Sequence, residues 1–314
     1  MAKIILFGEP MALLIADTTG PLETVEHFTR ALSGAEVNVA IGLSRLGHPV
    51  EYLTRLGDDP FGHYIEGELK RNHIGTSMLT YDSVYRTGIQ LKNRVTDGSD
   101  PHAPYYRKGS AASHISVKEI DALDLEDAEL IHVTGIPPAL SGTAREATFR
   151  LMERAREAGI LLTFDPNLRP ALWENEETMK RVINDLAKLA DIVLPGTEEC
   201  RILAGTEEPE KAADFYQNLG VKTVIVKAGG KGAYVREGAH SCQVPGYHVD
   251  KVVDTVGAGD GFAVGVLSGI LEGLTMEESV RRGNAIGAIQ VMNISDNAGL
   301  PDQAALRAFQ QKNE

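Results

Sequence analysis

The sequence predicts an α/β fold in which helices cover both faces of a parallel sheet and a small antiparallel sheet projects from the main domain. Short apolar runs alternate with amphipathic stretches through the middle of the chain, and this β-α-β rhythm is typical of parallel sheets. Two early segments break the rhythm with the alternation of strands. A glycine-rich turn opens an apolar helix near residue 257, and this turn carries most of the functional information.

Buried parallel strands are predicted at four apolar runs, which are residues 131–134, 160–165, 191–194 and 223–227. Between the first two runs, small and apolar residues recur at helical spacing from position 144 to position 158, and Gly159 ends this helix. Ligands bind outside the carboxyl ends of such strands. The polar residues that follow each run are therefore candidates for a binding site.

Residues 25–33 and 85–95, and residues 103–108 after a turn, have strand-like alternation. Strands inserted early into an α/β chain suggest a small sheet that acts as a lid or as an interface between subunits. Each segment rejoins the core at a glycine, Gly34 or Gly109, where a hinge is expected. We expect a single domain over residues 1–314, with the lid inserted at about 10–33 and 85–112 and the α/β core formed by 1–9, 34–84 and 113–314.

Composition excludes several classes of protein. The 314 residues are 43% hydrophobic and 24% charged, as in an ordinary globular chain, and the formal charge of -13 argues against nucleic acid and anionic membranes as partners. The two cysteines fit no metal or disulfide pattern, which favours a reducing compartment. The four apolar residues after Lys3 are too few for a signal peptide or a membrane span, so we expect a cytoplasmic protein that begins with a strand.

The glycine-rich turn spans residues 257–261 and contains Asp260. We expect it to join a short β-type run at residues 249–253 to the helix that starts near Phe262. An isolated Asp at such a place commonly only caps the helix. Glycine, however, costs roughly 1 kcal/mol relative to alanine in a helix, and a cap needs none of the glycines crowded here. We therefore favour a phosphoryl-binding turn in which Asp260 takes a proton from the attacking group.

At the level of motifs, the chain resembles the ribokinase-like, phosphofructokinase-B-type carbohydrate kinases. Residues 254–260 (DTVGAGD) are similar to the second signature of that family, and residues 33–40 (SGAEVNVA) followed by Leu46 and Gly47 are similar to the first, although Ser33 replaces a frequent glycine. The run GDDPFG at 57–62 is also typical. The resemblance covers essentially the whole chain. It implies a Rossmann-like, doubly wound sheet with a β-sheet lid and the cosubstrates ATP and Mg²⁺, and it leaves a monovalent cation open.

By this resemblance, Asp260 is the catalytic base, and Gly257, Ala258 and Gly259 form the anion hole. Glu199 has the place of a family acid that acts on the metal indirectly, but Gly196 stands where the family has Asn. The segment around Asn284 fits a position near adenine and, equally well, a helix of small residues packed on the sheet. The expected nucleotide contacts are Asn167, Arg169, Lys227, Ala228, Gly229, Gly230, Lys231, Gly232, Gly257, Ala258, Gly259 and Asn284.

Three finer matches, at residues 105–113, 164–173 and 296–301, resemble the 2-keto-3-deoxygluconate kinases of this family. A planar guanidinium holds both oxygens of a carboxylate better than an ammonium does, although a single Arg in an acidic protein is more often a surface ion-pair partner. A neutral hexose is less expected, because residues 9–14 lack the Asp that neutral-sugar kinases of the family carry. The residues expected to contact the sugar acid are Gly34, Asn38, Tyr106, Arg107, Arg169, Asp260 and Asp296.

The expected activity is transfer of the γ-phosphoryl group of ATP to a primary hydroxyl of 2-keto-3-deoxygluconate. A fructokinase or another neutral-sugar kinase is the alternative within the family, and a non-catalytic sugar-sensing protein is the alternative of another class. Dinucleotide oxidoreductases and Walker-type NTPases are excluded, because neither glycine motif occurs. We expect a homo-oligomer, a dimer or larger, that associates through the lid sheet.

Overall fold

The computed structural model describes residues 3–95, 102–293 and 297–313. Its main feature is a nine-stranded sheet of order β13-β12-β11-β10-β9-β8-β1-β4-β5. The neighbouring strands from β11 to β5 are parallel, and β12 is antiparallel both to β11 and to the edge strand β13. The strands are β1 (Lys3–Phe7), β4 (Val50–Gly57), β5 (Leu79–Asp82), β8 (Ala128–Thr134), β9 (Leu161–Asp165), β10 (Ile192–Val193), β11 (Thr223–Lys227), β12 (Ala233–Glu237) and β13 (His240–Val244).

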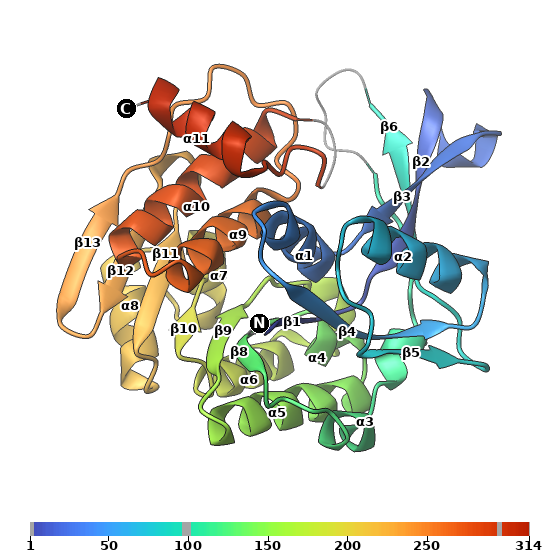
Figure 1. Ribbon diagram of the computed structural model, residues 1–314, viewed down its shortest axis with the longest axis horizontal. Helices are drawn as coiled ribbons and strands as arrows, with labels where there is room; N and C mark the ends of the chain where they lie inside the picture. Colours follow the sequence, from blue (N-terminus) through green and yellow to red (C-terminus); the bar gives the residue numbers. More distant parts are fainter. Residues whose placement is uncertain (1–2, 96–101, 294–296, 314) are drawn as a thin grey trace.

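Helices cover both faces of this sheet (Figure 1). Alternate residues of β1 enter two separate cores: Ile4 and Leu6 pack toward α1, α9 and α10, whereas Ile5 and Phe7 pack toward α5 and α6. The predicted α/β class with helices on both faces is thereby confirmed. The helices are α1 (Ala35–Arg45), α2 (Pro60–Arg71), α3 (Val117–Asp121), α4 (Pro137–Leu140), α5 (Gly142–Glu157), α6 (Glu176–Ala187), α7 (Thr197–Leu203), α8 (Pro209–Asn218), α9 (Ala258–Leu271), α10 (Met276–Val291) and α11 (Gln303–Lys312).

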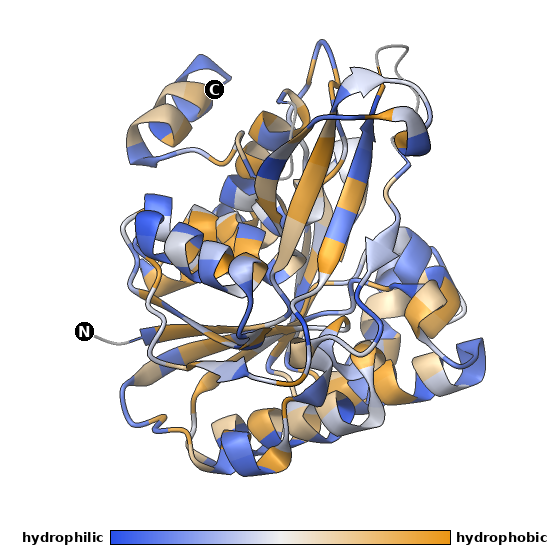
Figure 2. Ribbon diagram, turned by 90° about the vertical axis from the view of Figure 1, so that its right-hand side faces the viewer, coloured by the Kyte–Doolittle hydropathy of each residue, from blue (hydrophilic) through white to orange (hydrophobic). Residues whose placement is uncertain are grey.

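A second sheet of four strands, in the order β3-β2-β6-β7, stands beside the carboxyl ends of the main strands. The β2–β3 and β6–β7 pairs are antiparallel, whereas β2 and β6 run parallel. These strands are apolar where they leave the core and become polar toward their far ends (Figure 2). The strands of this small sheet are β2 (Met11–Thr19), β3 (Phe28–Ser33), β6 (Ile89–Arg94) and β7 (Tyr105–Tyr106).

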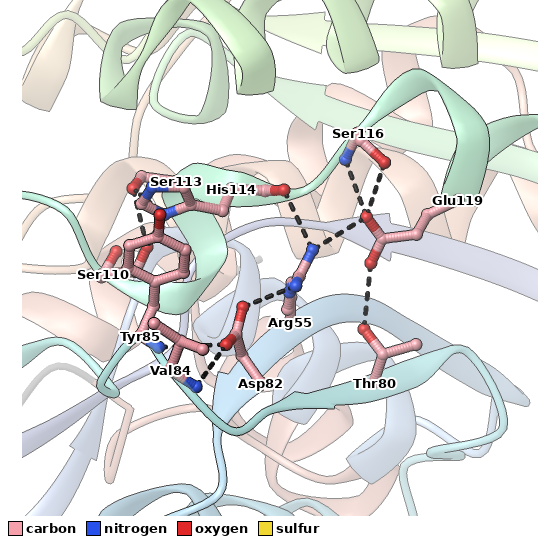
Figure 3. Close-up of polar contacts among 10 residues, drawn as sticks. All are labelled: Arg55, Thr80, Asp82, Val84, Tyr85, Ser110, Ser113, His114, Ser116 and Glu119. Atoms are coloured by element: carbon pink, nitrogen blue, oxygen red, sulfur yellow. Dashed lines mark hydrogen bonds and ion pairs between the residues drawn. The ribbon is translucent and has the colours of Figure 1, made fainter.

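The segments that enter and leave the small sheet are clamped to the core by a polar cluster (Figure 3). Arg55 on β4 lies between Asp82 at 2.5 Å and Glu119 at 3.2 Å. Asp82 also accepts hydrogen bonds from two backbone amides of the segment that leads to β6, and the Tyr85 ring of that segment stacks on His114. Residues 85–88 were predicted as strand, and these contacts explain why they form a turn instead.

The predicted strand at residues 249–253 is wrong. The chain there crosses from the edge strand β13 to the start of α9, so it has no neighbouring strand with which to pair. Val252 and Val253 are exposed, and the Val253 amide donates to the carbonyl of Val291 on α10. Gly257 therefore connects a loop, rather than a strand, to α9. The helix was predicted to start near Phe262 but starts at Ala258, so residues 258–261 of the predicted turn form the first turn of α9.

Helices α9 and α10 pack with unusually close backbones. A Cβ added at Gly265 would lie 2.4 Å from the backbone nitrogen of Gly283. The prediction of a small-residue helix around Asn284 agrees with this contact.

None of the helices within the described residues has both the length and the apolarity that a membrane span requires.

We predict that Gly265→Ala destabilises the protein by about 1–3 kcal/mol, because overpacking forces two backbones apart. Gly67→Ala is the matched control: the new methyl would meet only the flexible end of Arg71, at 3.7 Å, inside α2. It should stabilise by up to about 1 kcal/mol through helix propensity. Urea unfolding of both variants checks this pair, and equal midpoints would contradict the close packing.

Candidate active site

Two cavities meet at the carboxyl ends of the parallel strands. The first, of about 480 Å³, lies between the main sheet and the small sheet. The second, of about 680 Å³, is bounded by the loop after β11, the 246–252 loop and the helices α9 and α10. Both volumes are in the range of small-molecule sites. The two cavities share Lys227, Thr255 and Gly259.

The N-terminus of α9 lies where the cavities meet. Gly257 precedes the helix with a φ of 77°, a left-handed conformation that a residue with a side chain adopts only at a cost. The first backbone N–H groups of a helix have no acceptor within it, and they carry the positive end of the helix dipole. The turn can therefore hold an anion, and Asp260 lies within the first helical turn beside it.

Asp260 is held by two amide side chains. Asn38 of α1 donates to its Oδ2 at 2.8 Å, and Asn167, after β9, lies 3.5 Å from its Oδ1. Burial raises the pKa of Asp260 to about 6; Asp165 adds to this effect, and the Asn38 hydrogen bond opposes it. A carboxylate with such a pKa is a stronger proton acceptor than an exposed Asp and is still ionised near pH 7.

Lys227 supplies a cation at the boundary between the cavities. Its Nζ lies 2.6 Å from Oδ2 of Asp165. Burial alone would lower the pKa of Lys227, but the charges of Asp165 and Glu199 outweigh it and raise the pKa, so the lysine stays protonated. Glu199 in turn accepts hydrogen bonds from the backbone amides of Leu168 and Gly196, at 2.8 and 2.7 Å. Burial raises the pKa of Glu199.

The sugar-side cations behave differently from one another. Arg107 is buried and paired with Glu9, with its Nε 2.6 Å from Oε2 of the acid. Arg169 donates to the carbonyls of Asn167 and Leu168 at 3.3 and 3.0 Å. Both arginines line the first cavity.

Tyr106 does not line this cavity; Tyr105 does. Tyr106 is 65% exposed. Because successive residues of a strand point to opposite faces, Tyr105 lies on the same side of β7 as Arg107, and Tyr106 lies on the other. The expected contact of Tyr106 with the sugar acid stays a prediction, and the cavity lining adds Tyr105 as a second candidate.

The structure brings most of the other predicted residues together. Ala228 and the exposed Lys231 are not among the residues that line either cavity, and Asp296 falls outside the described residues. Among the predicted residues, the first cavity is lined by Gly34, Asn38, Asn167, Arg169, Arg107, Glu199, Lys227, Gly257, Gly259 and Asp260. Those that line the second are Lys227, Gly229, Gly230, Gly232, Ala258, Gly259 and Asn284.

Asn284 has the packing role that the sequence left open, and its position near adenine stays a prediction. It lies on the tightly packed helix α10 and also lines the second cavity. Its amide donates to the carbonyls of Val244 and Pro245 at 3.2 and 3.0 Å, which ties the end of β13 to the helix.

Sequence reasoning missed several lining residues, among them Glu9, Glu36 and Gln90. Glu36 is fully buried; burial raises its pKa to about 7, although the hydrogen bond from Thr134 opposes the shift. The sequence pattern could have indicated Glu9, because it is an acid inside an apolar run, and a buried acid needs a charged or hydrogen-bonding partner. The 246–252 loop was missed because its valines were interpreted as a strand.

With this geometry established, the chain was compared with known proteins. It matches the model of the pfkB family of carbohydrate kinases over residues 1–303. The chain belongs to this family. A 2-dehydro-3-deoxygluconokinase of Bacillus subtilis (strain 168) is 45% identical over 306 residues, covering 97% of this chain and 94% of that protein.

Solved structures of pfkB-type kinases also match. A PfkB protein from Polaromonas sp. JS666 is 47% identical with a TM-score of 0.90, covering 98% of this chain and 100% of that one. A fructokinase from Vibrio cholerae O395, in a form bound to fructose, ADP and calcium ion, is 28% identical with a TM-score of 0.86, covering 98% and 99%. The predicted activity class, an ATP-using carbohydrate kinase, is confirmed by membership in the pfkB family.

We predict that kcat/KM of this pfkB-type kinase falls about tenfold per pH unit below pH 6. The raised pKa of Asp260, about 6, means that the proton-accepting form is present above that pH and is lost as the pH falls through it. Asp260→Asn should lower turnover at least about 100-fold and remove this limb. The pH profile of both proteins is the measurement. A limb that persists in the Asn variant would assign it to another group.

We also predict that Tyr105→Ala raises the sugar KM about tenfold, corresponding to roughly 1.4 kcal/mol of lost contact. Tyr106→Ala is the matched control on the neighbouring position of β7 and should leave the sugar KM unchanged. Steady-state kinetics with varied sugar at saturating ATP distinguishes them. The reverse pattern would assign the contact to Tyr106.

Proposed function

We propose that this kinase transfers the γ-phosphoryl group of ATP to the primary hydroxyl of 2-keto-3-deoxygluconate and forms 2-keto-3-deoxy-6-phosphogluconate. The observation that carries the proposal is the presence of Arg107 and Arg169 on the same cavity as Asp260. Guanidinium groups suit a sugar carboxylate, and a carboxylate base suits its hydroxyl. The 45% identity with a 2-dehydro-3-deoxygluconokinase supports the same substrate.

The residues of the chain divide the reaction between the two cavities. The sugar binds in the first cavity, with its hydroxyl near Asp260, and ATP binds in the second, with its γ-phosphate at the turn. The hydroxyl oxygen bonds to the γ-phosphorus as the bond from that phosphorus to the bridging oxygen of ADP breaks, and Asp260 takes the hydroxyl proton. The amides of Gly257, Ala258 and Gly259, together with Lys227, stabilise the charge on the transferring group.

Mg²⁺ fits this site only as an ion held largely by phosphate oxygens and water. Both oxygens of Glu199 accept backbone hydrogen bonds, and those of Asp165 bind Lys227 and the Asn167 amide. The described residues contain no group of three or more His, Cys, Asp or Glu side chains arranged around a point. Mg²⁺ usually keeps several waters, so an indirect role of Glu199 is consistent. When bound, Mg²⁺ neutralises charge on the phosphates.

The small sheet is proposed to act as a lid that excludes water, hinged near Gly34 and Gly109, within a single catalytic domain. The exposed Val84 and Tyr106 on and near this sheet support association of subunits through it. We include in the proposal a cytoplasmic location and a monovalent cation near the active site.

Fructose is the second candidate substrate. The carboxylate of Glu9 compensates much of the charge of Arg107, so this cavity is less cationic than the two arginines alone suggest. The similarity to a fructokinase solved with fructose favours the same alternative.

A substrate panel tests the proposal. We predict that kcat/KM for 2-keto-3-deoxygluconate exceeds that for fructose and ribose by at least about tenfold, because neither neutral sugar has a carboxylate for a charge-assisted hydrogen bond. The galactonate epimer carries the same carboxylate and measures the stereochemical preference instead. Arg107→Lys keeps the charge that balances Glu9 but loses the planar fork, so it should raise the KM for the acid about tenfold and leave that for fructose unchanged. ADP formation is the readout. A preference for fructose in the wild type would overturn the acid substrate.

A further inference from the structure

An ion pair joins the small sheet to the anion-binding turn. Nζ of Lys92, on β6, lies 3.4 Å from Oδ2 of Asp254, which begins the DTVGAGD segment. The two side chains are only 12% and 14% exposed. Solvent and salt screen such a pair less than they screen a surface pair, so the interaction energy of the two charges depends on how they are placed.

Asp254 determines the shape of the turn. Its Oδ1 accepts a hydrogen bond from the amide of Val256 at 3.0 Å, and its own amide lies 3.3 Å from the carbonyl of Val291 on α10. Val256 and Gly257, the next residues, line the first cavity. A shift of Asp254 therefore moves the backbone that leads directly into the amides of the α9 N-terminus.

The partner of Asp254 comes from the side of the small sheet that covers the sugar cavity. Gln90 lines that cavity and is paired with Tyr105 across the strands. Lys92 is two residues further along β6 and lies on the same face as Gln90. The Arg55 cluster fixes the segments at the base of the sheet to the core (Figure 3). A change in the position of β6 over the cavity therefore reaches the anion-binding turn through the contact of Lys92 with Asp254.

We propose that Lys92 is a positioning residue for phosphoryl transfer: its ion pair with Asp254 aligns the anion-binding turn when the small sheet covers the sugar. The inference rests on the proposed role of the turn as the anion hole. It goes beyond that role, because it assigns to a residue of the small sheet the coupling between sugar coverage and the alignment of the catalytic amides. Lys92 does not contact the reacting atoms and acts through Asp254.

The alternative is an ion pair that only adds stability. Loss of a pair that only stabilises the fold would lower the unfolding midpoint and leave the chemistry of the folded enzyme intact. Loss of a positioning pair would lower kcat more than it changes KM for either substrate. It would also let water compete with the sugar as the phosphoryl acceptor, because the site would close poorly.

The test uses Lys92→Met, Lys92→Arg, Asp254→Asn and the Met/Asn double variant, assayed with 2-keto-3-deoxygluconate and ATP–Mg²⁺. Asn at position 254 still accepts from the Val256 amide, so that variant removes the charge and keeps the turn. Lys92→Met should lower kcat roughly 10- to 100-fold, as small misplacements of catalytic groups do, and Lys92→Arg should restore most of it. The double variant should lose clearly less than the product of the two single losses, because both single variants remove the Lys92–Asp254 contact.

The second readout is the amount of ADP formed per phosphorylated sugar. This ratio should be 1 in the wild type and clearly above 1 in Lys92→Met. Lys211→Met is the matched control: it breaks an exposed pair with Glu208 on α8 and should leave kcat and the ratio unchanged. If the preferred sugar proves to be fructose, the same measurements apply with fructose.

Additive losses in the double variant, or an unchanged kcat and ratio in Lys92→Met, would overturn the inference. Asp260→Asn separates this failure from failure of the proposed site. If Asp260→Asn is inactive while Lys92→Met is normal, the site stands and the coupling is wrong. If Asp260→Asn is fully active, the site itself is misassigned.

Discussion

Lys227 lines both cavities, and the need to compensate its buried charge determines which residues surround it. A buried ammonium is costly unless carboxylates compensate it. Asp165, the last residue of β9, and Glu199, in the first turn of α7, compensate the charge of Lys227. Glu199 also binds the amides of Leu168 and Gly196 and thereby fixes the loops that follow β9 and β10. Lys227, the cation that we propose to face the phosphates, therefore depends on the same contacts that fix the loop after β9.

In the first cavity, a second buried cation is also compensated by a carboxylate. Arg107 comes from the small sheet and Glu9 from the end of β1, so a single buried ion pair both tunes the cavity charge and ties the two sheets together. Asn38 plays a comparable double role, since its amide donates to Asp260 and its carbonyl accepts from Asn297. The groups that bind ligands are thus also the groups that join the layers.

The sequence predicted the parts of this structure that local patterns determine. Apolar runs located β9 and β11 because a buried parallel strand shows little except hydrophobicity, and glycine crowding located the start of α9. The choice between Tyr105 and Tyr106 required the strand register, which a two-residue strand does not show in its sequence. Glu9 was missed because its partner is 98 residues away. The loop at 246–252 resembled a strand because valine favours strands wherever a neighbour exists, and here there is none.

Burial raises the pKa values of three carboxyl groups that line the first cavity, those of Glu36, Glu199 and Asp260, so the charge of this cavity depends on pH. Glu36 is packed against the backbone of Gly8, where a Cβ would lie 2.3 Å from its Oε2, and its other oxygen accepts the hydrogen bond of Thr134. With a pKa of about 7, it is mainly neutral at the lower pH values at which Asp260, with a pKa of about 6, is already ionised. Within the cavity, Glu9 pairs with Arg107, and Asp165 pairs with Lys227. The proposed sugar acid fits this cavity because the guanidinium groups of Arg107 and Arg169 and the carboxylate of Asp260 occupy different positions, which would let the substrate carboxylate face the cations and its hydroxyl face the base.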